Sequence, residues 1–215
     1  TVMIVKQFRT GGDRNFGYLA ADEHSGEALV VDASWDPRSI ADFAAGHGYR
    51  IRYVFSTHSH ADHTNGNETM MRLTGVKPLL YGDICPLTDT GVEDGAFFPL
   101  GPLRVHIFHT PGHTPDSICL HVGDALFTGD TLFTGKVGGT GSGKEAAAEY
   151  DSLHRLLKEL PPATTVYPGH DYGERPVTTL GIEQRTNPFL LQPDFNAFLA
   201  LKNNWAAYKK EHGIK

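Results

Sequence analysis

Short runs of β-branched and aromatic residues, separated by turns rich in Gly, Asp and Ser, recur along the chain and predict strands. In the first half we expect strands over 4–8, 16–20, 28–32, 51–55 and 78–81. In the second half we expect strands over 103–108, 117–122, 125–127 and 164–167. The run 51–55 is short and, apart from Arg52, apolar, which is typical of a strand buried on both faces.

Helical patterns lie between these strands. A helix is expected over 36–45, with Pro in its first turn and glycines after it, and another through 70–73. The clearest helix spans 144–160, because its Tyr and Leu residues share one face and two prolines end it. A final helix is expected over 194–211. Strands that recur between helices predict an α/β fold with sheets covered by helices. With no linker or low-complexity segment, we expect a single domain over residues 1–215.

The charge of the chain excludes some classes of partner. It has 19 Lys+Arg against 25 Asp+Glu, a formal net charge of −6, and no run of basic residues. Nucleic acids and anionic membranes bind to clusters of positively charged residues, so we expect neither as a partner. No apolar stretch approaches the roughly 20 residues that a membrane-spanning helix needs, and the first residues lack the features of a secretory peptide.

The two cysteines, Cys85 and Cys119, make no disulfide framework. This usage suits a reducing compartment, and we expect the protein in the cytoplasm. Cys119 lies in an apolar run and is interpreted as a small core residue rather than a nucleophile.

Histidine is the residue type whose use is unusual. The chain has 12 histidines, where ordinary composition would give about five. Seven of them stand alone, without other metal-binding residue types at a telling spacing, and we interpret them as structural: His24, His47, His106, His109, His121, His154 and His212.

The remaining histidines, with two aspartates, follow the ends of four predicted strands. His58, His60, Asp62 and His63 come after 51–55, His113 after 103–108, Asp130 after 125–127 and His170 after 164–167. In layered α/β folds the loops at one sheet edge converge on a shared crevice, so these side chains are expected to meet. Imidazole and carboxylate suit Zn, Fe or Mn, and the lack of thiolates argues against a closed structural zinc site. Seven donors are too many for one tetrahedral ion, and they suit two ions with Asp130 as the bridge.

A second motif, 138–144, fits the G-x-x-x-x-G-K pattern of a nucleotide-binding loop and precedes a helix. Such a loop needs Ser or Thr next to hold Mg²⁺, whereas this chain has Glu145. We interpret the segment as a flexible connection beside the site.

At the seven clustered residues the chain resembles the metallo-β-lactamase superfamily, whose mark is a His-x-His-x-Asp-His loop after a strand. The resemblance implies a four-layer αβ/βα sandwich with the metals at one edge of two packed sheets. It also implies that His58, His60 and His113 hold the first metal, that Asp62, His63 and His170 hold the second, and that Asp130 bridges them.

Within the superfamily, the segments 57–63, 167–172, 179–181 and 185–190 resemble the glyoxalase II and persulfide dioxygenase branch. Glyoxalase II enzymes hydrolyse S-acyl glutathiones with Zn, Fe or Mn, and Tyr172 matches the tyrosine that contacts glutathione in them. The Gly-rich stretch 135–143 departs from the Gly-Arg-Ser/Thr-Asp-Phe-like pattern of both groups. The chain also ends soon after His170, as in compact glyoxalase-II-like hydrolases.

Three hypotheses for function follow. The first is a two-metal hydrolase, with Zn expected first and Fe or Mn as alternatives, in which Asp62 and Asp130 are catalytic and a small-molecule thioester is the substrate. The second is a dioxygenase that oxidises glutathione persulfide with one Fe(II), held by His58, His113 and Asp130 as a two-histidine, one-carboxylate triad. The third is a metal-binding module without catalysis. Other hydrolyses of the superfamily, of lactones or β-lactams, also remain open.

Overall fold

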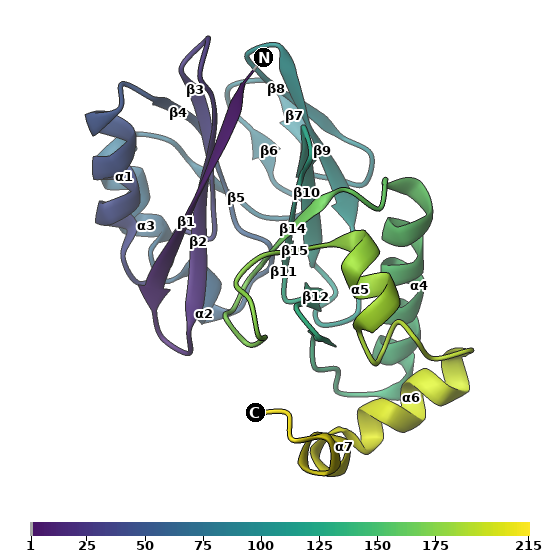
Figure 1. Cartoon of the computed structure of the whole chain (residues 1–215). Coiled ribbons are helices and arrows are strands. Elements are labelled where there is room, and N and C mark those ends of the chain that lie inside the picture. Colours follow the sequence, from purple (N-terminus) through teal and green to yellow (C-terminus); the bar gives the residue numbers. More distant parts are fainter. Residues whose placement is uncertain (1) are drawn as a thin grey trace.

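The computed structural model describes residues 2–215 and places two sheets face to face (Figure 1). The first sheet has five strands in the order β1-β2-β3-β4-β5. Its members are β1 (Met3–Gly11), β2 (Asn15–Asp22), β3 (Glu27–Val31), β4 (Arg50–Phe55) and β5 (Pro78–Leu79). The pairs β1–β2 and β2–β3 are antiparallel, whereas β3–β4 and β4–β5 are parallel.

The second sheet has six strands in the order β15-β14-β11-β10-β9-β8. Its members are β8 (Phe97–Leu100), β9 (Leu103–His109), β10 (Ile118–Val122), β11 (Ala125–Gly129), β14 (Thr165–Pro168) and β15 (Thr178–Thr179). Two short ribbons stand apart from both sheets: β6 (Ile84–Cys85) with β7 (Thr90–Gly91), and β12 (Leu132–Phe133) with β13 (Lys136–Val137).

Helices cover the outer face of each sheet. In Figure 1, α1 (Pro37–Gly46) and α3 (Asn67–Thr74) lie outside the first sheet. Helices α4 (Gly143–Glu159), α5 (Leu180–Thr186) and α6 (Phe195–Asn203) lie outside the second. The short α2 (Ala61–Thr64) follows β4, and α7 (Trp205–His212) is the last helix. The predicted four-layer αβ/βα sandwich is confirmed.

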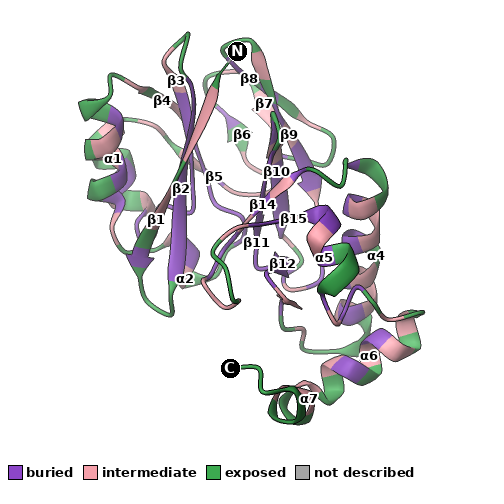
Figure 2. Cartoon of the chain, viewed as in Figure 1, coloured by how far each residue is buried: buried purple, intermediate pink, exposed green. Residues whose placement is uncertain are grey.

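Three clusters of buried residues fill the spaces between the four layers. One joins residues of both sheets, including Phe55 of β4 and Phe98 of β8, whose rings lie 5.3 Å apart. A second joins the other sheet face to α4 and α6, and the third joins β2–β4 to α1 and α3. Figure 2 shows the same pattern, with buried residues along the strands and on the inward side of the helices. The alternation along β8, exposed then buried, arises because successive side chains point to opposite faces of the sheet, and Phe98 and Leu100 point into the cluster between the sheets.

Most predicted elements form with small changes of boundary, but two expectations were wrong and several short elements, including α2, α5 and β8, were not predicted. The helix expected over 194–211 is broken at Asn204 into α6 and α7. Strand β5 ends at Leu79, two residues before the predicted end. The strand 97–100 was missed, because Pro99 within it argues against a strand unless it lies at an edge, which is where β8 lies.

Asp194 begins α6, and its Oδ1 accepts a hydrogen bond from the backbone N of Ala197 at 2.9 Å. Asp194→Ala leaves that backbone donor without its partner, so we expect the free energy of unfolding to fall by about 1 kcal/mol. Urea denaturation measures the change. The control is Asp151→Ala, an exposed aspartate within α4, for which no comparable loss is expected. Equal losses in the two variants would contradict the capping role.

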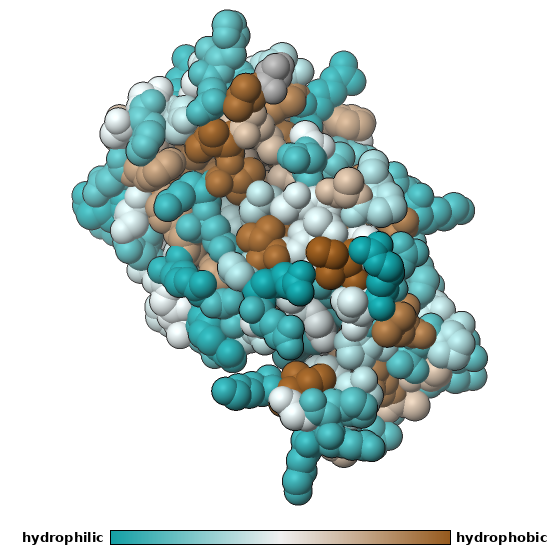
Figure 3. All heavy atoms as spheres, in the orientation of Figure 1, coloured by the Kyte–Doolittle hydropathy of each residue, from teal (hydrophilic) through white to brown (hydrophobic). Residues whose placement is uncertain are grey.

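The face in Figure 3 is mostly hydrophilic, with hydrophobic residues in small separate groups. Isolated exposed hydrophobic residues of this kind are ordinary on protein surfaces. Across residues 2–215, no helix combines the length and hydropathy that crossing a lipid bilayer requires.

Candidate metal centre

The seven predicted donors lie together at one edge of the two packed sheets. His58 and His60 occupy the segment after β4, and Asp62 and His63 lie on α2. His113 comes from the loop between β9 and β10. Asp130 and His170 follow the parallel neighbours β11 and β14. Four strand ends, from both sheets, therefore bring these side chains to a single place.

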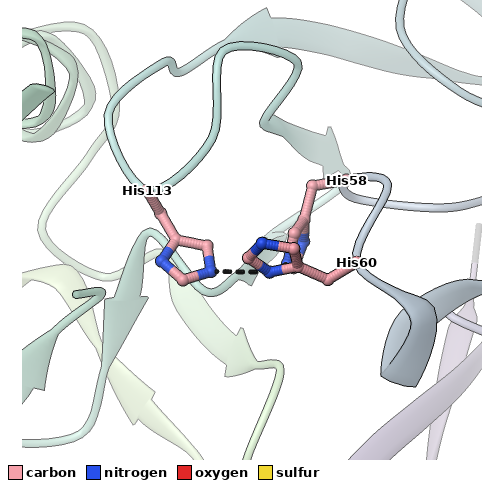
Figure 4. A group of neighbouring side chains, drawn as sticks. All are labelled: His58, His60 and His113. Atoms are coloured by element: carbon pink, nitrogen blue, oxygen red, sulfur yellow. Dashed lines mark hydrogen bonds between the residues drawn. The ribbon is translucent and has the colours of Figure 1, made fainter. Parts of the chain in front are cut away.

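Three imidazoles form one group. His58 Nε2 lies 3.0 Å from His60 Nδ1, and His113 Nε2 lies 3.1 Å from the same His60 atom. Figure 4 shows the three rings pointing toward one another from two different loops. His58 is buried, His113 is half-buried and His60 is exposed, so the group opens to solvent on the His60 side.

Asp62, His63 and His170 form a neighbouring group. His63 Nε2 lies 3.2 Å from His170 Nε2, and Asp62 Oδ2 lies 3.3 and 3.4 Å from those two nitrogens. These two groups have the same members as the two ligand sets that the family resemblance implies.

Asp130 lies between the two groups. Its Oδ2 is 3.4 Å from His113 Nε2 and 3.3 Å from His170 Nε2, and its Oδ1 is 3.3 Å from His63 Nε2. The residue is 8% exposed, and its Oδ1 makes no hydrogen bond to the described residues. A buried carboxylate oxygen without a donor is costly unless a cation takes that place.

Four of the imidazoles donate through Nδ1 to a neighbouring oxygen, which leaves Nε2 facing the cluster. His58 Nδ1 lies 3.0 Å from Thr57 Oγ1, and His63 Nδ1 lies 2.8 Å from Asp32 Oδ2. The backbone oxygens of Gly139 and Asp13 lie 2.7 Å from His113 Nδ1 and 2.8 Å from His170 Nδ1. Such partners fix the tautomer and ring orientation of metal-binding histidines.

The sequence reasoning missed two residues that hold this cluster. Asp32, 1% exposed, accepts hydrogen bonds from the backbone N and Oγ1 of Thr57 as well as from His63. Asn15, also 1% exposed, donates from Nδ2 to the backbone oxygen and to Oδ2 of Asp62. A carboxylate at the end of an apolar strand was a usable signal for Asp32, whereas nothing in the sequence singled out Asn15.

Charge balance within the cluster shifts the pKa values of its members in opposite directions. Burial and the nearby His63 lower the pKa of His58 to about 3. Burial also acts to lower the pKa of His63, but the carboxylates of Asp32, Asp130 and Asp62 outweigh it and raise that pKa to about 12. Hydrogen bonding from His63 lowers the pKa of Asp62, and the hydrogen bond from His170 helps to hold the pKa of Asp130 low against burial.

The donor set fits divalent metal ions. A tetrahedral ion with metal–nitrogen distances of about 2.0–2.1 Å needs ligand atoms roughly 3.3–3.4 Å apart. Within the two groups the facing nitrogens are 3.0–3.2 Å apart. Because Asp130 reaches both groups, the cluster has the donors of a dinuclear site.

A cavity of about 780 Å³ adjoins the second group. Tyr172 lines it and stacks on His170, with ring centroids 4.6 Å apart. Arg14 Cζ and Lys136 Nζ lie 4.7 and 4.6 Å from the Tyr172 ring centroid. Lys209 also lines the cavity, so its walls carry several cations beside the cluster.

The seven histidines interpreted as structural take no part in the candidate metal groups found among residues 2–215. Cys119 is fully buried, and burial raises the pKa of its thiol to about 12, which suits a core residue rather than a nucleophile.

The model of the metallo-beta-lactamase superfamily matches residues 10–170, which include all seven donors. The chain belongs to this superfamily. Among curated relatives, the hydroxyacylglutathione hydrolase of Polaromonas sp. is 39% identical over 180 residues, covering 80% of this chain and 68% of the relative. A probable polyketide biosynthesis zinc-dependent hydrolase, BaeB of Bacillus velezensis, is 34% identical over 75% of each chain.

Solved structures of the superfamily have the same fold. ETHE1 from Myxococcus xanthus has a TM-score of 0.83 and 32% identity, covering 94% of this chain and 91% of that one. TTHA1623, crystallised in a di-iron-bound form, has a TM-score of 0.69 and 28% identity, covering 86% of this chain and all of that one. A zinc-dependent relative and a di-iron neighbour agree with the metals that the donor types predict.

Proposed function

We propose that this chain is a metal-dependent thioesterase of the glyoxalase II type, which hydrolyses a small-molecule thioester such as an S-acyl glutathione. In this proposal His58, His60 and His113 hold one ion, Asp62, His63 and His170 hold the other, and Asp130 bridges them. The single observation that carries the proposal is a buried carboxylate within 3.4 Å of imidazoles from two adjoining donor groups. The hydroxyacylglutathione hydrolase relatives, 37–39% identical, support the thioester as substrate.

When bound, two divalent ions supply a hydroxide nucleophile near neutral pH and polarise the thioester carbonyl. One of the protein's own carboxylates would then orient this nucleophile. Asp62 is suited to this role, because its side chain is 36% exposed against 10% for Asp130 and Asn15 holds its Oδ2. Asp130 lies between the two donor groups and would hold them at a fixed separation. The departing thiolate needs no strong general acid, since thiols have a pKa of about 8.5.

The cavity beside His170 suits the thiol part of the substrate. The cations of Arg14 and Lys136 both lie over the ring of Tyr172, and the Tyr172 hydroxyl donates to Asp13 Oδ2 at 2.6 Å. A thiol that carries carboxylates, as glutathione does, is attracted by this excess of positive charge. We assign Tyr172 as the substrate-binding residue that joins this cavity to the cluster.

The decisive experiment compares two assays on protein purified without added metal. About two metals per chain, with thioester cleavage and no oxygen uptake, is the result expected of the proposed hydrolase. Oxygen consumption with glutathione persulfide and about one iron per chain would contradict it.

That second outcome defines the alternative function, a mononuclear Fe(II) persulfide dioxygenase. The likeness to ETHE1, which covers more than nine-tenths of both chains, favours it. His58, His113 and Asp130 would then hold the iron as the two-histidine, one-carboxylate triad.

Lys136→Met tests the thiol cavity. The substitution keeps the length of the side chain and removes a half-buried cation beside Tyr172. We expect KM for an S-acyl glutathione to rise about tenfold, equivalent to about 1.4 kcal/mol of binding, with little change in kcat. Steady-state kinetics measures both constants, and Lys210→Met, an exposed lysine of α7, is the control. An equal rise in KM for the thioester of an uncharged thiol would contradict the charge recognition.

A further inference from the structure

A buried ion pair lies behind the metal centre and has no part in the chemistry above. Glu149 of α4 is 0% exposed, and Lys202 of α6 is 10% exposed at its side chain. Their Oε1 and Nζ atoms lie 2.6 Å apart. Burial raises the pKa of Glu149 to about 7. Because desolvating two charges costs about as much as their attraction returns, such a pair is weak evidence of stabilisation and points to another role.

Lys202 connects this pair to the metal centre through the loop before α4. Its Nζ also donates to the backbone oxygen of Gly138 at 2.7 Å. The next residue, Gly139, accepts the hydrogen bond from His113 Nδ1. Gly138 is packed against the ligands themselves, since a Cβ there would lie 1.9 Å from the Asp130 backbone oxygen and 3.1 Å from His113 Cβ. The position of the Gly139 carbonyl therefore depends on the segment that Lys202 holds.

Glu149 supports the same histidine from the other side. Gly112, which precedes His113, has φ +150°, and a Cβ on it would lie 2.4 Å from Glu149 Cβ. One helical turn later, Ser152 Oγ donates to the Pro111 backbone oxygen at 2.8 Å. Helix α4 therefore contacts the backbone of the His113 loop directly through Ser152 and Glu149. Glu149 also forms the ion pair with Lys202.

We propose that Glu149 and Lys202 are positioning residues for His113, which hold its Nδ1–H on the Gly139 carbonyl and so aim Nε2 at the first metal position. The inference rests on the proposed metal centre, because it assigns a role in holding one of its ions. In this inference helix α6 supports the metal centre through Lys202, although no residue of α6 belongs to the donor groups.

The test uses Lys202→Met and the double variant Glu149→Leu/Lys202→Met in the full chain. The single variant leaves a buried carboxylate unpaired and is expected to lose stability. The double variant leaves no unpaired charge, so its thermal stability should approach that of the wild type while the Gly138 carbonyl stays without its donor. In both, affinity at the first metal position should fall 10- to 100-fold, as loss of such support typically causes.

Competition against a chromophoric chelator measures zinc affinity at each position, and the visible spectrum of the Co(II)-loaded protein reports the geometry at His113. Lys158→Met, an exposed lysine of α4, is the matched control and should keep wild-type affinity. A folded double variant with wild-type affinity and Co(II) spectrum would overturn the inference. Wild-type protein that binds no metal would instead overturn the proposed function.

Discussion

Asp130→Ala should abolish metal loading and turnover together. Among residues 2–215, Asp130 is the carboxylate that lies close to both donor groups, with imidazole nitrogens of His63, His113 and His170 at 3.3–3.4 Å. Without it, no carboxylate would lie between the two cations to offset their mutual repulsion. We expect metal content to fall from about two ions to less than one per chain, and kcat/KM to fall by roughly 10³-fold or more.

Metal analysis of the purified variant and thioester kinetics with added zinc measure these effects. Asp42→Ala, an exposed aspartate of α1, is the control, and circular dichroism checks that both variants fold. An Asp130→Ala protein that stays fully loaded and active would rule out the bridging role.

The second large effect is a fall in the stability of the metal-free protein as the pH rises from 7 to 9. Burial acts to lower the pKa of His63, but its three carboxylate neighbours raise it to about 12, far above the ordinary 6.5. Stability from a raised pKa is complete below 6.5 and is lost as the pH rises toward the folded-state value. The folded chain holds one more proton than the unfolded chain across pH 7–9. The free energy of unfolding should therefore fall by about 1.4 kcal/mol per pH unit.

Three other shifted groups leave this sign unchanged. Burial acts to lower the pKa of His170, but the hydrogen bond to Asp130 raises it, so His170 adds to the fall. His58, whose pKa burial lowers to about 3, is neutral in both states above pH 7, so it adds no slope there. Burial raises the pKa of Glu149 to about 7, so it adds only a small fall in the same direction. Urea denaturation of chelator-treated protein at several pH values measures the slope.

The zinc-loaded protein is the control, because metal binding displaces the His63 proton and its stability should change far less. The same displacement predicts that zinc affinity rises with pH over this interval. Metal-free protein that gains stability between pH 7 and 9 would contradict the protonated His63.

Local sequence patterns were sufficient to locate the strands whose ends carry the donors, but not the short helix α2 that holds Asp62 and His63. The largely apolar run of β4 and the periodic leucines of α4 predicted those two elements closely. The edge strand β8 and the break at Asn204 were not predictable in this way, since neighbouring elements rather than local pattern decide them.

The residue types at four strand ends also predicted which side chains meet, because loops at one sheet edge must lie near one another. The oxygens that orient the imidazoles could not be predicted. The carbonyls of Asp13 and Gly139 belong to loops far from His170 and His113 in sequence, and any residue type has a carbonyl.

The sequence by itself therefore determined the α/β class, the superfamily and the choice of seven candidate donors, because periodic burial and a dense His/Asp motif depend on residue types alone. Tertiary structure alone decided how those donors are held. The contacts of Asp32, Asn15 and the Glu149–Lys202 pair join segments between 31 and 64 residues apart, and such pairings exist only once the layers have packed.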